Sequence, residues 1–254
     1  MDLDSELLLD ELYNAFDPFE PLPANDERYV DCKEVRGNED ILKIGRKIKR
    51  SRRNTCQLYA GHRGAGKSTE LLRLKDYLEK YEFYVVYFAA DEEDIDSEDA
   101  QYTDILLACT RHLLEELKNA DSIPLRNWLK ECWDDLKDLM MTKIELEGFS
   151  IETGEITGLF AKLTANLKAV PSERSKIRAR VNPHTVNLIK ALNQFIDNAT
   201  KKLTDNNKKL AIIVDNLDRI APITRENGRN NHDEIFLDRS EQLQGLNCSV
   251  IYTV

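Results

Sequence analysis

The sequence lacks the features that would direct a chain into a membrane or out of the cell. No apolar run in its 254 residues approaches 18 residues, so no transmembrane helix is expected. The first residues, 1–6, are acidic and do not resemble a signal peptide. The five cysteines are scattered and form no C-x-x-C pair, which favours free thiols over a disulfide framework or a zinc site. Together these absences predict a cytoplasmic protein with no membrane contact.

Positive charge is also scarce. The chain has 36 lysines and arginines against 46 acidic residues, a formal net charge of −10. This balance disfavours a general coat for nucleic acid or a membrane surface, although it is compatible with a local basic patch. Hydrophobic residues make up 41% of the chain, which is enough to build a core in one large domain or two small ones.

One stretch carries a specific chemical signal, because residues 61–69 fit the pattern G-x-x-x-x-G-K-[ST]. Glycines let backbone N–H groups surround a phosphate, and a helix that begins there directs its positive end at the same anion. Lys67 can reach the terminal phosphates, and the Ser68 hydroxyl can ligate Mg²⁺. The predicted nucleotide-binding residues are Gly61, His62, Arg63, Gly64, Ala65, Gly66, Lys67, Ser68 and Thr69.

The surroundings of this stretch strengthen the prediction. A strand-like segment, 55–60, precedes it, and a helical pattern with Leu71, Leu74 and Leu78 on one face follows it. Strand, glycine loop and helix are the setting that a phosphate-binding loop requires. The alternative is a glycine-rich turn that binds nothing.

A second part of the site is predicted at Asp215. The apolar run 210–214 ends in this acid and is typical of a buried parallel strand, whose carboxyl end is where open α/β sheets bind ligands. Asp215 is therefore predicted to hold Mg²⁺ opposite Ser68.

The residue after this aspartate is unusual for an ATPase. Many P-loop ATPases carry a glutamate there, whereas this chain carries Asn216, which cannot take a proton. Asp218 is the nearest acid that can serve as a general base. Either Asp218 acts or hydrolysis is slow; the alternative role for Asp218 is a salt bridge or a helix cap.

The rest of the chain is divided by periodicity into several predicted elements. Residues 91–99, acidic at seven of nine positions, are expected to form a solvated loop that caps the next helix. The helix over 2–16 is expected to cover the core or to contact a partner. Helices are predicted over 2–16, 41–53, 100–119, 123–141 and 183–199, and further strands over 83–90 and 248–254.

The long connection between the second strand and the strand at 210 is predicted to form an insertion. Its segment 144–170 favours a β-hairpin, with a helix from 159 as the alternative. The expected organisation is an N-terminal helix and Pro-rich extension (1–28), an ATPase core (29–99 and 205–254) and a helical insertion (100–204).

The sequence resembles the AAA+/STAND group of P-loop ATPases, in particular its origin-recognition-like and bacterial signalling branches. The resemblance rests on four stretches, 35–37, 59–71, 214–219 and 251–253, and it covers most of 29–254. It implies a three-layer α/β fold around a central parallel sheet. It also implies ATP or ADP as the nucleotide, with Mg²⁺; no N-K-x-D motif for guanine is present.

Further roles follow only from this resemblance. Val35, Arg36 and Gly37 would lie near the adenine, with Arg and Gly in the reverse of the family's usual order, and Thr253 would sense the γ-phosphate. Family members carry a C-terminal helical lid, which is expected to be absent here because the sequence ends at Val254.

Three functions remain open at this stage. The first is a slowly hydrolysing ATP switch in a larger bacterial signalling or antiviral defence protein, acting as a homo-oligomer or on an effector. The second is a DNA-binding ATPase, supported by two basic clusters at 43–53 and 174–180. The third is a non-enzymatic interaction platform that a bound nucleotide stabilises.

Overall fold

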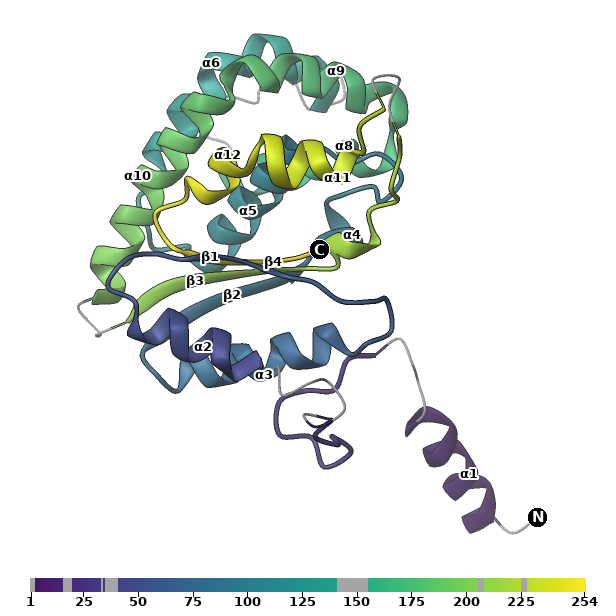
Figure 1. Cartoon of the computed structure of the whole chain (residues 1–254). Helices are drawn as coiled ribbons and strands as arrows, with labels where there is room; N and C mark the ends of the chain where they lie inside the picture. Colours follow the sequence, from purple (N-terminus) through teal and green to yellow (C-terminus); the bar gives the residue numbers. More distant parts are fainter. Residues whose placement is uncertain are drawn as a thin grey trace.

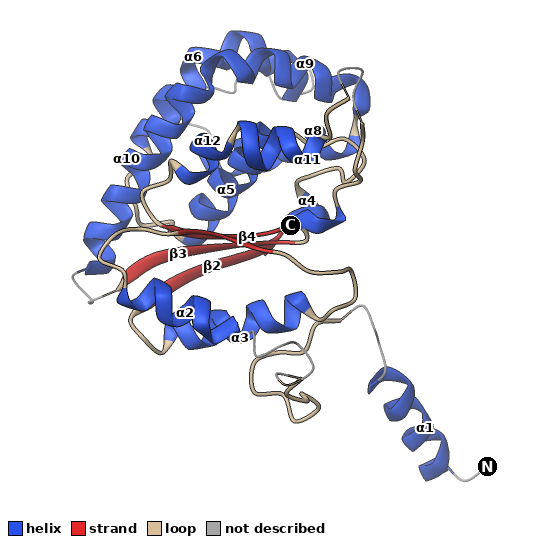
Figure 2. Ribbon diagram, in the orientation of Figure 1, coloured by secondary structure: helices blue, strands red, loops and turns tan. Residues whose placement is uncertain are grey.

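A four-stranded, all-parallel sheet forms the centre of the protein. The computed structural model describes residues 3–15, 20–32, 34, 41–140, 155–204, 208–224 and 228–254. The sheet has the order β1-β4-β3-β2. The strands are β1 (Cys56–Tyr59), β2 (Phe83–Ala89), β3 (Lys209–Asp215) and β4 (Ser249–Thr253). Helices cover both faces, so the predicted three-layer α/β fold is confirmed (Figures 1 and 2).

The register of the strands aligns their carboxyl ends at one edge of the sheet. Ala89 pairs with Asp215, and Tyr59 pairs with Thr253. Six of the seven β3 residues are buried, as expected for a strand covered on both faces. The loop after β1 and the turn after β3 therefore open on the same side of the molecule, which is where doubly wound sheets bind ligands.

One face of the sheet is covered by α2 (Ile41–Arg50) and α3 (Lys67–Glu79) (Figure 1). Leu71, Leu74 and Leu78 are fully buried, which confirms the predicted inner face of this helix. The two helices pack closely at Gly45, where an added Cβ would lie 2.6 Å from the Tyr77 ring. A small residue at this position thus lets α2 lie against α3.

The helices between β2 and β3 cover the other face. Their buried side chains form one continuous hydrophobic cluster with residues of the sheet such as Val86, Ile212 and Tyr252. The helices and turns of this segment are α4 (Ala90–Glu93), α5 (Tyr102–Glu116), α6 (Ile123–Met140), α8 (Ile156–Ala169), α9 (Pro171–Val181), the 3₁₀ turn η1 (Asn182–His184) and α10 (Thr185–Thr204).

Short turns and helices connect β3 to β4. They are the 3₁₀ turn η2 (Leu217–Arg219), α11 (Asn231–Asp233), the π-helix η3 (Glu234–Asp238) and α12 (Ser240–Gln244). Leu243 of α12 and Ile235 of η3 belong to the same hydrophobic cluster as the longer helices. Among the helices that the structure describes, none is long and apolar enough to cross a membrane.

The predicted β-hairpin is wrong over residues 156–169, which form the helix α8, and the alternative of a helix from 159 is the correct one. Apolar residues and alanines alternate there with polar ones, and this alternation favoured a strand. The buried positions instead follow helical spacing, because Leu159, Phe160, Leu163 and Leu167 face the core. Alanine has the highest helix propensity, which fits the outcome. The remainder of the predicted hairpin, 144–154, lies outside the described residues.

The helix α1 (Leu3–Ala15) forms where helical spacing predicted it, but it does not cover the core. Leu7, Leu8, Leu9 and Leu12 are each about half exposed, and Figure 1 shows the helix apart from the body of the protein. The expected core-covering role is therefore wrong for this helix.

Candidate nucleotide-binding site

The glycine loop between β1 and α3 adopts a conformation that needs its glycines. Gly64 and Gly66 have φ angles of 80° and 76°, in the left-handed region that other residues rarely adopt. The helix α3 begins at Lys67, directly after Gly66. The backbone N–H groups of its first turn have no partners within the helix and can face an anion.

Lys67 folds back over its own loop. Its Nζ donates to the carbonyl oxygens of Gly61 (2.7 Å) and His62 (3.0 Å). It also lies 2.9 Å from Oδ2 of Asp218, and only 7% of Lys67 is exposed. The salt bridge that the sequence analysis gave as the alternative role of Asp218 is thus present. An added Cβ at Gly61 would lie 3.4 Å from Cδ of Lys67, so a small residue there leaves room for the lysine stem.

Asp215 is buried at the end of β3, and both of its carboxylate oxygens accept hydrogen bonds. The Tyr87 hydroxyl donates to Oδ2 (2.8 Å), and the Asn216 backbone N–H donates to Oδ1 (2.7 Å). Burial, followed by the charge of Asp215 and this hydrogen bond, raises the pKa of Tyr87. The phenol therefore stays protonated as a donor that orients the carboxylate. Sequence reasoning missed Tyr87, whose position on β2 becomes informative only once β2 is paired with β3.

Residues of the glycine loop and of the turn after β3 line one open cleft of about 1080 Å³. Lys67, Ser68, Thr69, Asp215 and Asp218 all contribute to its wall. The remaining lining residues are Glu20, Pro21, Arg63, Gly64, Gly66, Leu72, Tyr87, Phe88, Ala89, Glu92, Glu93, Arg111, His112, Glu115, Asn216 and Arg219. The cleft thus unites the glycine loop with the end of β3, as the sequence predicted from two separate motifs.

Thr253 has a different environment from the one that a direct phosphate contact would require. It is fully buried, and its Oγ1 accepts a hydrogen bond from the Leu217 backbone N–H (2.9 Å). The hydroxyl therefore holds the turn that carries Asp218. The other residues predicted by resemblance, Val35, Arg36 and Gly37, lie outside the described residues.

Asp91, which sequence reasoning did not select, connects this turn to the end of β2. Its Oδ1 accepts from the Asn216 side-chain amide (2.7 Å), and its Oδ2 accepts from Arg219 (2.8 Å). Asn216 has a φ of 62°, a left-handed conformation that asparagine tolerates better than most residues. Asn216 thus occupies the glutamate position as a structural residue of the turn.

The expected solvated loop over 91–99 is wrong for several of its acids. Its first residues belong to α4, and Asp94 is 1% exposed. Burial opposes ionisation of Asp94, but contacts with His112 and Arg111 outweigh it, so its pKa is lowered. The helix that follows is capped by Gln101 together with Asp104, not by residues 91–99.

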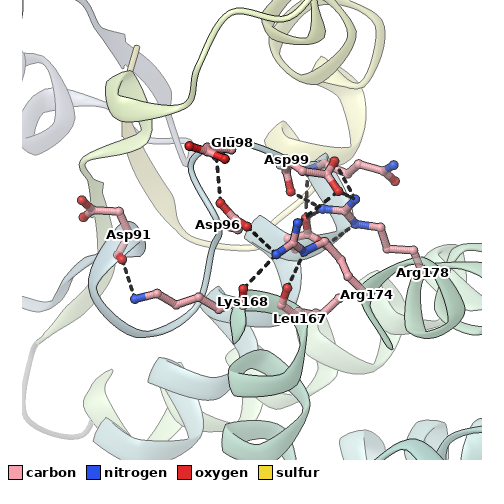
Figure 3. A network of polar contacts seen from close by, with 10 residues as sticks. Asp91, Asp96, Glu98, Asp99, Leu167, Lys168, Arg174 and Arg178 are labelled. Atoms are coloured by element: carbon pink, nitrogen blue, oxygen red, sulfur yellow. Dashed lines mark hydrogen bonds and ion pairs between the residues drawn. The ribbon is translucent and has the colours of Figure 1, made fainter. Parts of the chain in front are cut away.

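Two arginines of α9 hold the same acidic segment. Arg174 pairs with Asp96 and lies 3.2 Å from Asp99, and Arg178 pairs with Asp99 at 2.9 Å (Figure 3). Both arginines are buried. The basic cluster predicted at 174–180 is therefore partly internal, and Arg174 and Arg178, two of its three arginines, neutralise neighbouring acids.

Lys168 of α8 completes a network that reaches the site. Its Nζ donates to the backbone carbonyl of Asp91 (2.7 Å; Figure 3). It also donates to the backbone carbonyl of Glu92. Arg174 also donates to the carbonyl of Lys168 (2.8 Å). A continuous series of polar contacts therefore leads from Asn216 through Asp91 to the helices α8 and α9.

The Pro-rich passage before α2 lies against the start of α3. The Leu22 backbone N–H donates to Oγ1 of Thr69 (3.1 Å), and the Tyr29 hydroxyl donates to Glu70 (2.9 Å). Burial and this contact raise the pKa of Tyr29 to about 12. Because Glu20 and Pro21 line the cleft, this passage forms part of its wall. No local pattern in the sequence marked these contacts.

The site suits a magnesium ion that shares its ligands with a nucleotide. Among the described residues, no group of three or more histidines, cysteines, aspartates and glutamates is arranged to hold a metal by itself. Mg²⁺ commonly uses one or two carboxylates together with substrate phosphates and water. Ser68 and Asp215 line the same cleft and offer such oxygens.

The strand, glycine loop and helix, with a buried aspartate at the end of a neighbouring parallel strand, define a P-loop nucleoside triphosphatase fold. The chain belongs to the KAP family of P-loop domains: the model of that family matches residues 51–227, which are 177 of the 254 residues. Comparison with curated proteins and with solved structures finds no match. Membership of this family implies nucleotide binding. The AAA+/STAND placement remains a prediction.

Proposed function

We propose that the protein is an ATP·Mg²⁺-binding switch module that hydrolyses ATP slowly within a larger signalling or defence protein. The observation that supports this most directly is the meeting of Lys67, Ser68 and Asp215 in one cleft. These groups offer a cation for the terminal phosphates, a hydroxyl for Mg²⁺ and a carboxylate for the metal shell.

The contacts of each residue suggest its role. Lys67 and the backbone of 61–69 hold the phosphates, and Ser68 and Asp215 hold the metal. Asp218 is the proposed general base, because it is a carboxylate in the cleft close to Lys67. Thr253 is proposed to act through the turn that carries Asp218, since its hydroxyl binds the backbone N–H of Leu217.

We propose slow hydrolysis because Lys67, Asp218 and Asn216 already bind other protein groups. A lysine ammonium has three N–H donors, and Lys67 has three partners: two carbonyl oxygens and Asp218. A phosphate oxygen can bind Nζ only in place of one of them. Asn216 accepts no proton, and its side-chain amide is bound to Asp91. We propose that a phosphate oxygen takes the place of Asp218 at Nζ, and that this exchange precedes the activation of water by the released carboxylate.

The same contacts give the switch a physical route. Displacement of Asp218 by a phosphate shifts the turn over 216–219, to which Asp91 is bonded through Asn216 and Arg219. Asp91 is in turn held by Lys168 on α8. We propose that nucleotide occupancy is transmitted along this path to α8 and α9. Ordering of loops around a γ-phosphate is an established switching route.

Hydrogen exchange combined with calorimetry tests this proposal. ATP·Mg²⁺ should slow amide exchange in 156–181, and ADP should do so less. The Lys168→Met variant should bind ATP as the wild type does but should lose the exchange response. The Lys176→Met variant removes an exposed cation of α9 that pairs with Glu173, and it should behave like the wild type. Identical exchange with and without ATP would exclude the switch.

Further measurements distinguish this proposal from the two alternative functions, a non-enzymatic platform and a DNA-binding ATPase. ATP binding with no measurable turnover would favour a non-enzymatic platform stabilised by nucleotide, whereas turnover that Asp218→Asn abolishes would exclude this platform. The same proposal includes a homo-oligomer or an effector protein that responds to the bound nucleotide. The molecular mass of the protein in solution, measured with ATP and with ADP, tests for the homo-oligomer. For the DNA-binding alternative, Arg174 and Arg178 offer no support because they are buried among acids.

A further inference from the structure

The helix α2 and the three residues after it carry a concentration of positive charge that the nucleotide site does not use. Seven cations and no acid occur between Ile41 and Arg53. Outside this segment the chain has 29 basic and 46 acidic residues, a balance of −17, against +7 within it. The cations are Lys43, Arg46, Lys47, Lys49, Arg50, Arg52 and Arg53.

The five of these cations that belong to α2 lie away from its buried side. Ile41 and Ile48 are each 2% exposed and pack in the hydrophobic cluster shared with α3 and the sheet. Lys43, Lys47 and Arg50 are exposed. Together with Arg46 and Ser51, these three residues line an open hollow of about 550 Å³.

Neutral groups hold two of the cations in place. Nζ of Lys47 donates to the side-chain oxygen of Gln57 (3.2 Å), and Nζ of Lys49 lies 3.3 Å from the centre of the Tyr81 ring. Such contacts position a charge without cancelling it. The arrangement contrasts with Arg174 and Arg178, which are buried and paired with aspartates.

The helix dipole explains only part of this pattern. Cations are favourable in the last turn of a helix, which covers Lys47, Lys49 and Arg50. The helix dipole does not account for Lys43 and Arg46 in the first two turns, or for the arginines beyond the end of the helix.

We propose that this face of α2 binds double-stranded nucleic acid through its phosphates. Lys43, Arg46, Lys47 and Arg50 recur at helical spacing on one side, and from the first to the last the helix rises about 10 Å. Successive phosphates of one duplex strand advance about 3.4 Å along the axis, so this row spans about three such steps, which join about four phosphates. Four cations in a row thus match a phosphate backbone without reading its sequence.

Other partners of similar charge fit less well. Residues 41–53 contain no aromatic side chain on which unpaired bases would stack. A helix that lies on a membrane inserts an apolar face, whereas the apolar side of α2 is buried against α3 and the sheet. Backbone contact with a duplex therefore fits the composition and the packing together.

The test is a binding titration of the chain with a short DNA duplex, an RNA duplex of the same sequence and vesicles that contain phosphatidylserine. Four phosphate contacts predict that DNA affinity falls by about 100-fold when salt rises from about 50 mM to about 200 mM. Comparison of the DNA and RNA arms identifies which duplex is preferred.

Two matched quadruple variants decide whether α2 is the site. The first carries Lys43→Gln, Arg46→Gln, Lys47→Gln and Arg50→Gln. The second removes four exposed lysines from helices on the opposite face of the sheet or just beyond their ends: Lys118→Gln, Lys130→Gln, Lys190→Gln and Lys201→Gln. Both lower the net charge equally, and ATP binding by each verifies that it is folded.

The expected result is that the α2 variant loses duplex binding and its salt dependence, while the control retains both. Equal loss in the two variants would mean that only overall charge matters, and would overturn the proposal. Binding to vesicles but not to either duplex would overturn it as well, as would the absence of salt-dependent binding in the wild type. Each of these outcomes is independent of whether the chain hydrolyses ATP.

Discussion

Nζ of Lys67 and Oδ2 of Asp218 lie 2.9 Å apart, although the two residues are 151 positions apart in the sequence. The pair joins the glycine loop to the turn after β3, and both side chains are largely buried. Because phosphate and carboxylate are both anions, they compete for the same ammonium group. This relationship makes the two residues respond differently to substitution.

Removal of the Lys67 charge should abolish nucleotide binding. Lys67→Met keeps most of the side-chain volume but leaves the terminal phosphates without their cation. A charge-assisted contact of about 3 kcal/mol corresponds to a loss of more than 100-fold in ATP affinity, measured by calorimetry. The control is Lys75→Met, which removes a lysine of the same helix that only approaches Glu79 at 4.0 Å. ATP binding of wild-type strength in Lys67→Met would refute the phosphate-binding role.

Neutralising Asp218 should have the opposite effect on binding. Asp218→Asn removes the anion that competes for Lys67, so ATP affinity should rise by about fivefold, which corresponds to about 1 kcal/mol. If Asp218 is also the general base, turnover should fall by at least about 100-fold. Asp238→Asn, which breaks an exposed pair with Arg229, serves as the control. Weaker ATP binding in Asp218→Asn would contradict the competition.

Tyr87 is predicted to position the metal ligand. Tyr87→Phe removes the hydroxyl that orients Asp215 and leaves the ring in place. Loss of a group that orients a metal ligand typically costs about 10-fold to 100-fold in metal affinity. A titration of turnover against Mg²⁺ should therefore shift to higher concentration, while ATP binding without Mg²⁺ stays unchanged.

The matched control for this substitution lies on the same strand. Tyr84→Phe removes a hydroxyl that, among the described residues, contacts Glu116, and neither residue lines the cleft. An identical Mg²⁺ response in the two variants would show that Tyr87 does not act through the metal ligand.

The lowered pKa of Asp94 makes part of the stability depend on pH. Its folded pKa lies below the unfolded value of about 3.9. The stability that its charge contributes is therefore present above that value and is lost as pH falls through it toward the folded pKa. Asp94→Asn should cost about 1–3 kcal/mol of unfolding free energy at neutral pH. The difference from the wild type should shrink below about pH 4.

Denaturant unfolding at several pH values measures this difference. Asp134→Asn is the control, because the side chain of that aspartate is 92% exposed and, among the described residues, pairs with Lys137 of the same helix. If the difference in unfolding free energy between wild type and Asp94→Asn is constant over the whole pH range, the charge of Asp94 contributes nothing to stability.

Local pattern was sufficient to predict most of the elements and the two motifs of the site. The strand at 210–215 and the face of α3 follow directly from apolar periodicity, and glycine spacing identified the loop. The hairpin prediction failed because Leu and Ala alternated over a few residues, a pattern that a helix with an alanine-lined outer face also produces. Periodicity over short segments does not separate these cases.

Contacts between distant segments could not be predicted in this way. Tyr87, Asp91 and the passage 20–29 reach the site only through the pairing of β2 with β3 and the course of the chain over α3. The acids of 91–99 looked solvated because their partners, Arg111, Arg174 and Arg178, come from other helices. The position of a charged residue in the sequence shows neither which residue it pairs with nor whether it is buried.

The pairing of β2 with β3 also sets a requirement on how the chain folds. These strands form the longest register of the sheet, yet residues 90–208 separate them. Their pairing must close a long loop, which costs entropy before any strand contact is gained. Since the intervening helices share one hydrophobic cluster with the sheet, we infer that their packing offsets part of this entropic cost. Substitutions in the packed core of α5 or α10 should therefore slow refolding of the sheet itself.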